Sequence, residues 1–85
     1  MDSQDKITVV LTNKNTTLSM NRFEVYDNVS DAPVGVFALK GGESRSIEIT
    51  RGADGKGSVK IRDLDRGRDE WVESGAIGAA AVITA

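Results

Sequence analysis

The chain of 85 residues contains no cysteine and no histidine. Without cysteine it can form neither a disulfide nor a thiolate zinc site, which are common ways of stabilising a small domain. It also lacks the cysteine nucleophile and the histidine base on which much catalysis near neutral pH depends. Because no other catalytic motif stands out, we expect that the protein is not an enzyme and that it holds no cofactor, with calcium as the one open alternative.

The sequence also lacks a long apolar run and an excess of charge of one sign. No stretch approaches the ~20 apolar residues that cross a bilayer, and residues 1–5 form a polar arm unlike a secretory signal. Eleven Lys and Arg residues are balanced by 13 Asp and Glu residues, whereas nucleic-acid binding usually needs a clustered basic face. We therefore expect no membrane span, no nucleic-acid partner and, by default, a cytoplasmic location.

What the chain does contain is short segments in which apolar and polar residues alternate. In residues 6–12, Ile7, Val9 and Leu11 fall on one face, and a period of two is typical of a half-buried β-strand. Clusters of Gly, Asn, Asp and Ser separate this segment from similar ones at 22–27, 34–40, 45–50, 58–62, 70–73 and 76–85. The pattern predicts one all-β domain over residues 6–85, an antiparallel β-sandwich of about seven short strands, with a small β-barrel as the alternative.

The same alternation predicts which side chains form the core. The nine candidates are Ile7, Val9, Leu11, Phe23, Val25, Ile47, Ile49, Val59 and Ile61. Residues 34–40 are nearly continuous in apolar side chains, so their inward face is ambiguous. We favour Phe37 and Leu39 as the inward pair over Val34, Val36 and Ala38, because they are bulkier.

Three segments predict turns. Asn13-Lys14-Asn15 should end the first strand, because asparagine tolerates left-handed backbone and hydrogen-bonds its own backbone. Gly41-Gly42 predicts a tight turn. The three glycines of residues 52–57 predict a loop that closes a hairpin between the strands on either side.

The acidic segment after residue 62 offers a candidate metal site. Asp63, Asp65 and Asp69 could converge carboxylate oxygens on a hard cation such as calcium, since a tight loop turns alternate side chains inward. The segment matches an EF-hand loop poorly, and arginines at positions 62, 66 and 68 offer the carboxylates a simpler partner. We favour ion pairing at the surface and keep calcium binding as the alternative.

The aromatic residues are few, and two of them are candidate binding residues. Trp71 and Tyr26 could stack on a sugar ring or anchor a partner protein. A lone tryptophan in a small sandwich more often packs in the core, and we favour that interpretation for Trp71.

Residues 76–85 carry no charge and no proline, and both faces of a strand formed there would be apolar. A domain of this size has little material to cover the second face. We therefore expect a second chain to cover it, with Ala80 and Val82 in the interface. The predicted function is a non-catalytic interaction or structural module that associates with itself or with another protein. The alternative is a small lectin-like module that binds carbohydrate, with or without calcium.

Overall fold

The computed structural model describes residues 6–17, 19–65 and 70–85. In these residues the chain forms strands and turns, and no helix that could span a membrane is present among them. The strands are β1 (Lys6–Thr12), β2 (Met20–Asp27), β3 (Ala32–Lys40), β4 (Ser44–Thr50), β5 (Val59–Asp63), β6 (Val72–Glu73) and β7 (Val82–Thr84).

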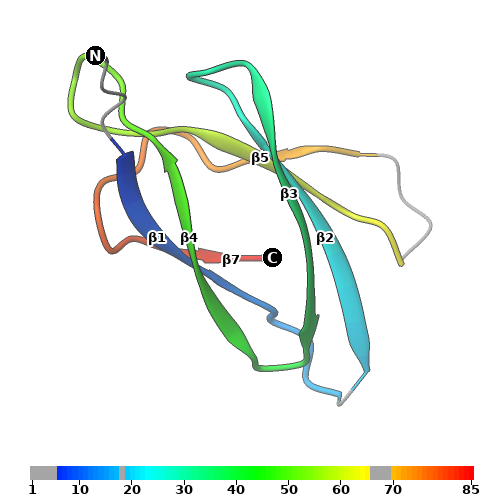
Figure 1. Ribbon diagram of the computed structural model, residues 1–85. Coiled ribbons are helices and arrows are strands. Elements are labelled where there is room, and N and C mark those ends of the chain that lie inside the picture. The colour runs from blue at the N-terminus through cyan, green and yellow to red at the C-terminus, as the bar shows by residue number, and fades with distance from the viewer. Residues whose placement is uncertain (1–5, 18, 66–69) are drawn as a thin grey trace.

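The strands form two sheets that pack face to face (Figure 1). The three-stranded sheet has the order β4-β1-β7, and the four-stranded sheet has the order β3-β2-β5-β6. The predicted all-β sandwich is therefore confirmed. One pair departs from the antiparallel expectation, because β7 runs parallel to β1 with Val82 opposite Val10.

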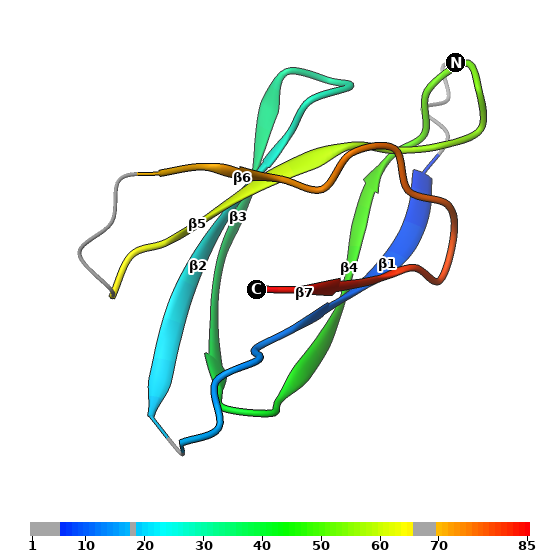
Figure 2. The same cartoon turned by 180° about the vertical axis from the view of Figure 1, so that it is seen from behind.

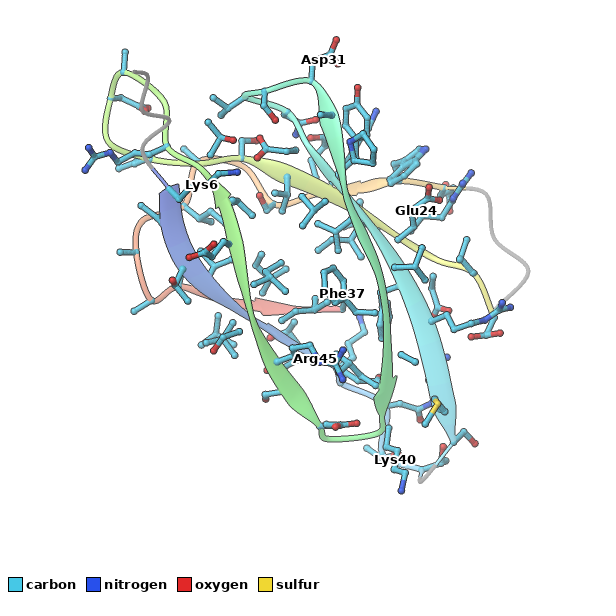
Figure 3. All side chains as sticks on the ribbon, in the orientation of Figure 1. Lys6, Glu24, Asp31, Phe37, Lys40 and Arg45 are labelled. Carbon is cyan, nitrogen blue, oxygen red and sulfur yellow. The ribbon has the colours of Figure 1, made fainter. Side chains whose placement is uncertain are left out.

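The core lies between the two sheets and is built from the inward side chains of the alternating strands. All nine residues predicted from the alternation are buried, and Leu39 and Ile83 join them. Leu39 is fully buried and Phe37 packs against the core from the inner side of β3, as Figure 3 shows, which confirms the favoured orientation of this strand. Val34 packs against the core as well, because a β-bulge in the β2–β3 ladder leaves it without a residue opposite.

The two glycine-rich turns have different outcomes. Gly41 and Gly42 do form a tight turn, in which Gly42 takes a φ of 82°. The prediction that residues 52–57 close a hairpin is wrong, because β4 and β5 belong to different sheets and do not pair. Turn residues indicate where a chain reverses but carry no information about which sheet the next strand joins.

The C-terminal segment is not the continuous strand that the sequence predicts. Only Val82–Thr84 is a strand, and Ile77 makes an isolated bridge with Gly57. Between them the N–H of Ala81 donates to the carbonyl of Gly78, and Ala80 has a φ of 65°. This turn is needed because the chain leaves the four-stranded sheet after β6 and crosses to reach β1, as Figure 2 shows.

Asn13 ties the two sheets together at the end of β1. Its side chain is fully buried, and its amide nitrogen donates to Asn21 Oδ1 at 3.1 Å and to the carbonyl of Leu39 at 2.9 Å. Its Oδ1 accepts from the N–H of Asn15 at 2.9 Å. The residue therefore ends its strand by bonding local backbone, as predicted, and also bonds two strands of the opposite sheet.

Asp27 provides a second tie at the end of β2. It is 3% exposed, and its Oδ2 accepts from the N–H of Thr50 in the other sheet at 2.8 Å. Its Oδ1 accepts from the N–H groups of Val29 and Ser30. Burial alone would raise the pKa of Asp27, but the hydrogen bonds from Thr50, Ser30 and Val29 outweigh it and lower that pKa.

Candidate functional site

The two aromatic candidates lie together on the outer face of the four-stranded sheet. Tyr26 on β2 lies opposite Lys60 on β5, and Trp71 directly precedes β6. The rings of Tyr26 and Trp71 meet edge to face, with centroids 6.4 Å apart and planes at 65°. The antiparallel pairing of β2 with β5 thus brings together side chains that are far apart in the sequence.

Basic side chains of the same sheet contact both rings. The Lys60 ammonium lies 4.9 Å from the centroid of Tyr26 and 5.0 Å from that of Trp71, and the Arg62 guanidinium carbon lies 4.6 Å from Trp71. These distances fall within the range of cation–π attraction. Arg62 also forms an ion pair with Glu24, its cross-strand neighbour (Figure 3 labels Glu24).

These contacts correct the expectation that Trp71 packs in the core. Trp71 is half-buried on the outer face, on the opposite side of the sheet from the core side chains. Its contacts with Lys60 and Arg62 hold the start of β6 against β5, and this structural role explains the position of Trp71 without a ligand. A binding role for Trp71 or Tyr26 stays a prediction.

Tyr26 makes one further contact, at the turn between β2 and β3. Its hydroxyl donates to Asp31 Oδ1 at 2.6 Å. Because the carboxylate accepts from the protonated phenol, this bond raises the pKa of Tyr26 above its ordinary value. Asp31 itself has a φ of 56°, a conformation that aspartate tolerates in turns. The hydroxyl therefore holds the Tyr26 ring against the turn between β2 and β3.

Asp63 and Asp65 lie at the end of β5 and just beyond it. Asp63 accepts from the N–H of Asp65 at 2.9 Å and from the Asn21 amide at 3.3 Å. Asp65 forms an ion pair with Arg22 on β2, with 2.9 Å between Nη2 and Oδ1. The hydrogen bonds from the Arg22 side chain and backbone lower the pKa of Asp65.

This geometry changes the partners that the sequence suggested. Asp65 pairs with Arg22 across the sheet, and Arg62 pairs with Glu24, so neither follows the expected pairing within the segment. Asp69, Arg66 and Arg68 lie outside the described residues. Among the residues that are described, no three acidic side chains are arranged to hold a metal ion. Calcium binding stays an untested alternative.

Val82 and Ala80, the predicted interface residues, lie at the edge of the three-stranded sheet. Val82 is 63% exposed and faces outward beside Val10, while Ala80 is exposed in the turn before β7. The nearest outward residues are uncharged, and we call this surface the Ser/Thr/Val face: Val10, Thr12, Ser44, Ser46, Val82 and Thr84. The exposed charges of Glu48 and Lys6 lie beyond it on the same side of the sheet. Thr12 and Ser44 hydrogen-bond across it, with their oxygens 2.7 Å apart.

Sequence reasoning missed this face as a whole. Its residues come from three separate segments, and their common character becomes visible only when β4, β1 and β7 are placed side by side. The available signal was the predominance of Ser and Thr at the outward positions of residues 8–12 and 44–46, whereas the outward positions of residues 22–26 and 60–62 carry charges.

A groove of about 370 Å³ opens between β6 and β7, the edge strands of the two sheets. Its apolar lining includes Phe23, Ile61 and Ile83 from the core and Val72 at the rim. The sequence could not indicate this groove, because its two walls belong to different sheets.

Comparison of the chain with known protein families, with curated proteins and with solved structures finds no match.

Proposed function

We propose that this protein is a non-catalytic interaction module that self-associates through the Ser/Thr/Val face and the adjoining edge of β7. The observation that carries the proposal is the position of Val82, which is 63% exposed on the edge strand of the sheet, beside the uncharged residues of the Ser/Thr/Val face. Val10 lies directly beside it on β1. Val82 is exposed and Val10 half-buried, and such apolar surface gains free energy when a second surface removes it from water.

The lack of charge suits this face to pairing with a copy of itself. In a two-fold dimer each residue near the axis meets the same residue of the partner, so a charged residue there would face a like charge. Ser, Thr and Val carry no such penalty, and sheets pack face to face through surfaces of this shape. The outer face of the four-stranded sheet, with Arg22, Glu24 and Lys60, is less suited to such contact.

The edge of β7 adds a second reason. β7 has a neighbour on one side only, so its alternate backbone groups are directed to the open side. The strand is three residues long and carries no charge or proline that would prevent pairing with another chain. Ala80 lies just before it and is expected at the rim of the same interface.

The test compares two valines of similar exposure on opposite faces. We expect light scattering to show a dimer for the wild type and a single chain for Val82→Lys, because the new ammonium groups would repel across the two-fold axis. Val36, which is 56% exposed on the outer face of β3, is the matched control. Val36→Lys should leave the dimer intact.

A wild-type mass equal to one chain from micromolar to millimolar concentration would contradict the proposal. So would equal dissociation by Val82→Lys and Val36→Lys, because that result would assign the effect to net charge. Circular dichroism of each variant would show whether the sandwich is retained.

A further inference from the structure

We propose that the groove between β6 and β7 docks an extended segment of another protein, which adds to β6 as an extra strand. The segment carries apolar side chains toward the groove and basic side chains toward solvent. This groove adjoins the Ser/Thr/Val face at β7, where Val82 and Thr84 belong to both, but the proposal does not require self-association.

The first observation is the exposure of Val72. It lies opposite Ile61 in the β5–β6 pair, so both side chains are directed to the inner face of the sheet. Ile61 is 4% exposed, whereas Val72 is 67% exposed. An inward-facing valine that is two-thirds exposed shows that the inner face of the four-stranded sheet continues beyond the part that the other sheet covers.

The second observation is that one side of the sandwich is closed and the other is open. On the closed side, the turn after Lys40 joins β3 directly to β4, and Phe37 packs against the core. On the open side, β6 and β7 border the groove, and among the described residues each pairs with a strand on one side only. A strand edge of this kind, beside a groove with an apolar floor and charged residues in its lining, fits an extended polypeptide, whose backbone can pair with the edge while its side chains fill the groove.

The third observation concerns charge along β6. Glu73 on β6 is exposed and faces outward opposite Lys60 of β5, and it accepts from the Asn28 amide at 2.9 Å. Glu70 precedes β6 and is exposed as well, and both glutamates line the groove. Opposite charges on neighbouring strands stabilise pairing and like charges oppose it. A segment with Lys or Arg at its outward positions would therefore pair favourably with β6, and an acidic segment would not. On the groove's other wall, Lys14 follows β1, with its N–H bonded to the carbonyl of Ala85.

The probe is an acetylated peptide of about six residues in which Val and Lys alternate, long enough for one strand. A peptide in which Val and Glu alternate tests the charge preference. A peptide with the same Val and Lys grouped in two blocks tests the alternation. We expect the alternating Val-Lys peptide to bind at least about tenfold more tightly than either control, and to shift the amide resonances of Val72, Glu73 and Ile83.

Two variants and one control then locate the site. Val72→Lys should abolish binding, and Val72→Thr, which keeps the β-branched shape, should weaken it. Val36→Lys should bind as the wild type does, since Val36 lies on the outer face. Repeating the titration with Ser46→Lys, which changes the Ser/Thr/Val face outside the groove, separates this site from the proposed dimer interface, because loss of the dimer should leave peptide binding unchanged.

The proposal is overturned if the Val-Lys peptide does not bind, if the Val-Glu or block peptide binds as tightly, or if Val72→Lys binds as the wild type does. Amide shifts confined to another surface would overturn it as well. If Val72→Lys instead converts an oligomer into single chains, the occupant of the groove is a second copy of this chain and the proposed partner is wrong.

Discussion

The two sheets are alike on their inner surfaces and different on their outer ones. Both present buried aliphatic side chains to the core, such as Ile49 in the three-stranded sheet and Ile61 in the four-stranded sheet. On the outer surface of the four-stranded sheet, charged and aromatic side chains contact one another, as in the pair of Glu24 with Arg62. The Ser/Thr/Val face of the other sheet has a single side-chain hydrogen bond between Thr12 and Ser44 and leaves Val82 exposed.

This difference indicates where a partner is needed. A surface whose charges are paired within the chain loses hydration and gains little when another molecule covers it. An uncharged surface with exposed valines gains from being covered. The two outer faces therefore predict different responses to the same substitution, which is why Val82 and Val36 form a matched pair.

The largest expected loss of stability comes from the core, and it tests whether the inner surfaces of the two sheets contribute equally to the fold. Replacing Ile49 or Ile61 by alanine removes a buried side chain from one sheet or the other. Each change should lower the free energy of unfolding by about 2–5 kcal/mol, which is a large part of the stability of a domain this small. Urea unfolding followed by circular dichroism measures the free energy of unfolding of both variants.

If only one of these two substitutions lowered the stability, the sheets would not share one core. Replacing Val36, which is exposed, by alanine is the control. That change should leave the free energy of unfolding within about 0.5 kcal/mol of the wild-type value.

A smaller effect is expected at Asp27, which joins the two sheets. Asp27→Asn should lower the free energy of unfolding by about 1–3 kcal/mol at neutral pH, because hydrogen bonds from backbone N–H groups to a buried charged acceptor are weakened. The pKa of Asp27 is lowered in the folded protein relative to the ordinary value of 3.8. The carboxylate's contribution is therefore fully present above that value and is lost as the pH falls through the lower folded pKa.

The difference in stability between the wild type and Asp27→Asn should accordingly shrink in strong acid. Asp54→Asn, in the exposed loop after β4, is the control for loss of one surface charge and should change the free energy of unfolding little. A gap between wild type and Asp27→Asn that stays constant from neutral pH into strong acid would show that the carboxylate charge does not stabilise the fold.

The smallest effect is expected at the ion pair of Arg22 with Asp65 on the charged outer face. Both side chains are partly exposed, at 56% and 30%, so water and salt screen their attraction. A double-mutant cycle with Arg22→Ala and Asp65→Ala should give a coupling free energy well below the effect at Asp27, and high salt should reduce it further.

Thermal melts of the wild type and of Asp65→Ala, with and without calcium, test the alternative of a metal site. A large calcium-dependent rise in Tm that is lost in Asp65→Ala would favour a metal site over the ion pair.

Much of the fold could be predicted because burial follows the period of two. The alternation in residues 6–12 and 45–50 assigns each side chain to one face, and a slip of one residue would expose the whole apolar set. The orientation of Phe37 and Leu39 followed from their bulk, although the bulge that also brings Val34 to the core gave no signal. The candidate site was less predictable: Trp71 and Tyr26 were identified as individual residues, but their joint contact with Lys60 depends on the pairing of β2 with β5.

The amino-acid sequence by itself determined the all-β class, the strand positions over most of the chain and the inward face of each, because these depend on neighbours along the chain. Only the tertiary structure decided which strands pair, and so it decided that the loop before Gly57 crosses between sheets. A side chain at Gly57 would lie 2.6 Å from Ile49 Cδ1, so glycine is required there for close packing between strands. The segment 76–85 also shows what local sequence cannot determine. Its alanines do not specify an inward face, and the crossing of the chain from β6 to β1 decided where the last strand begins.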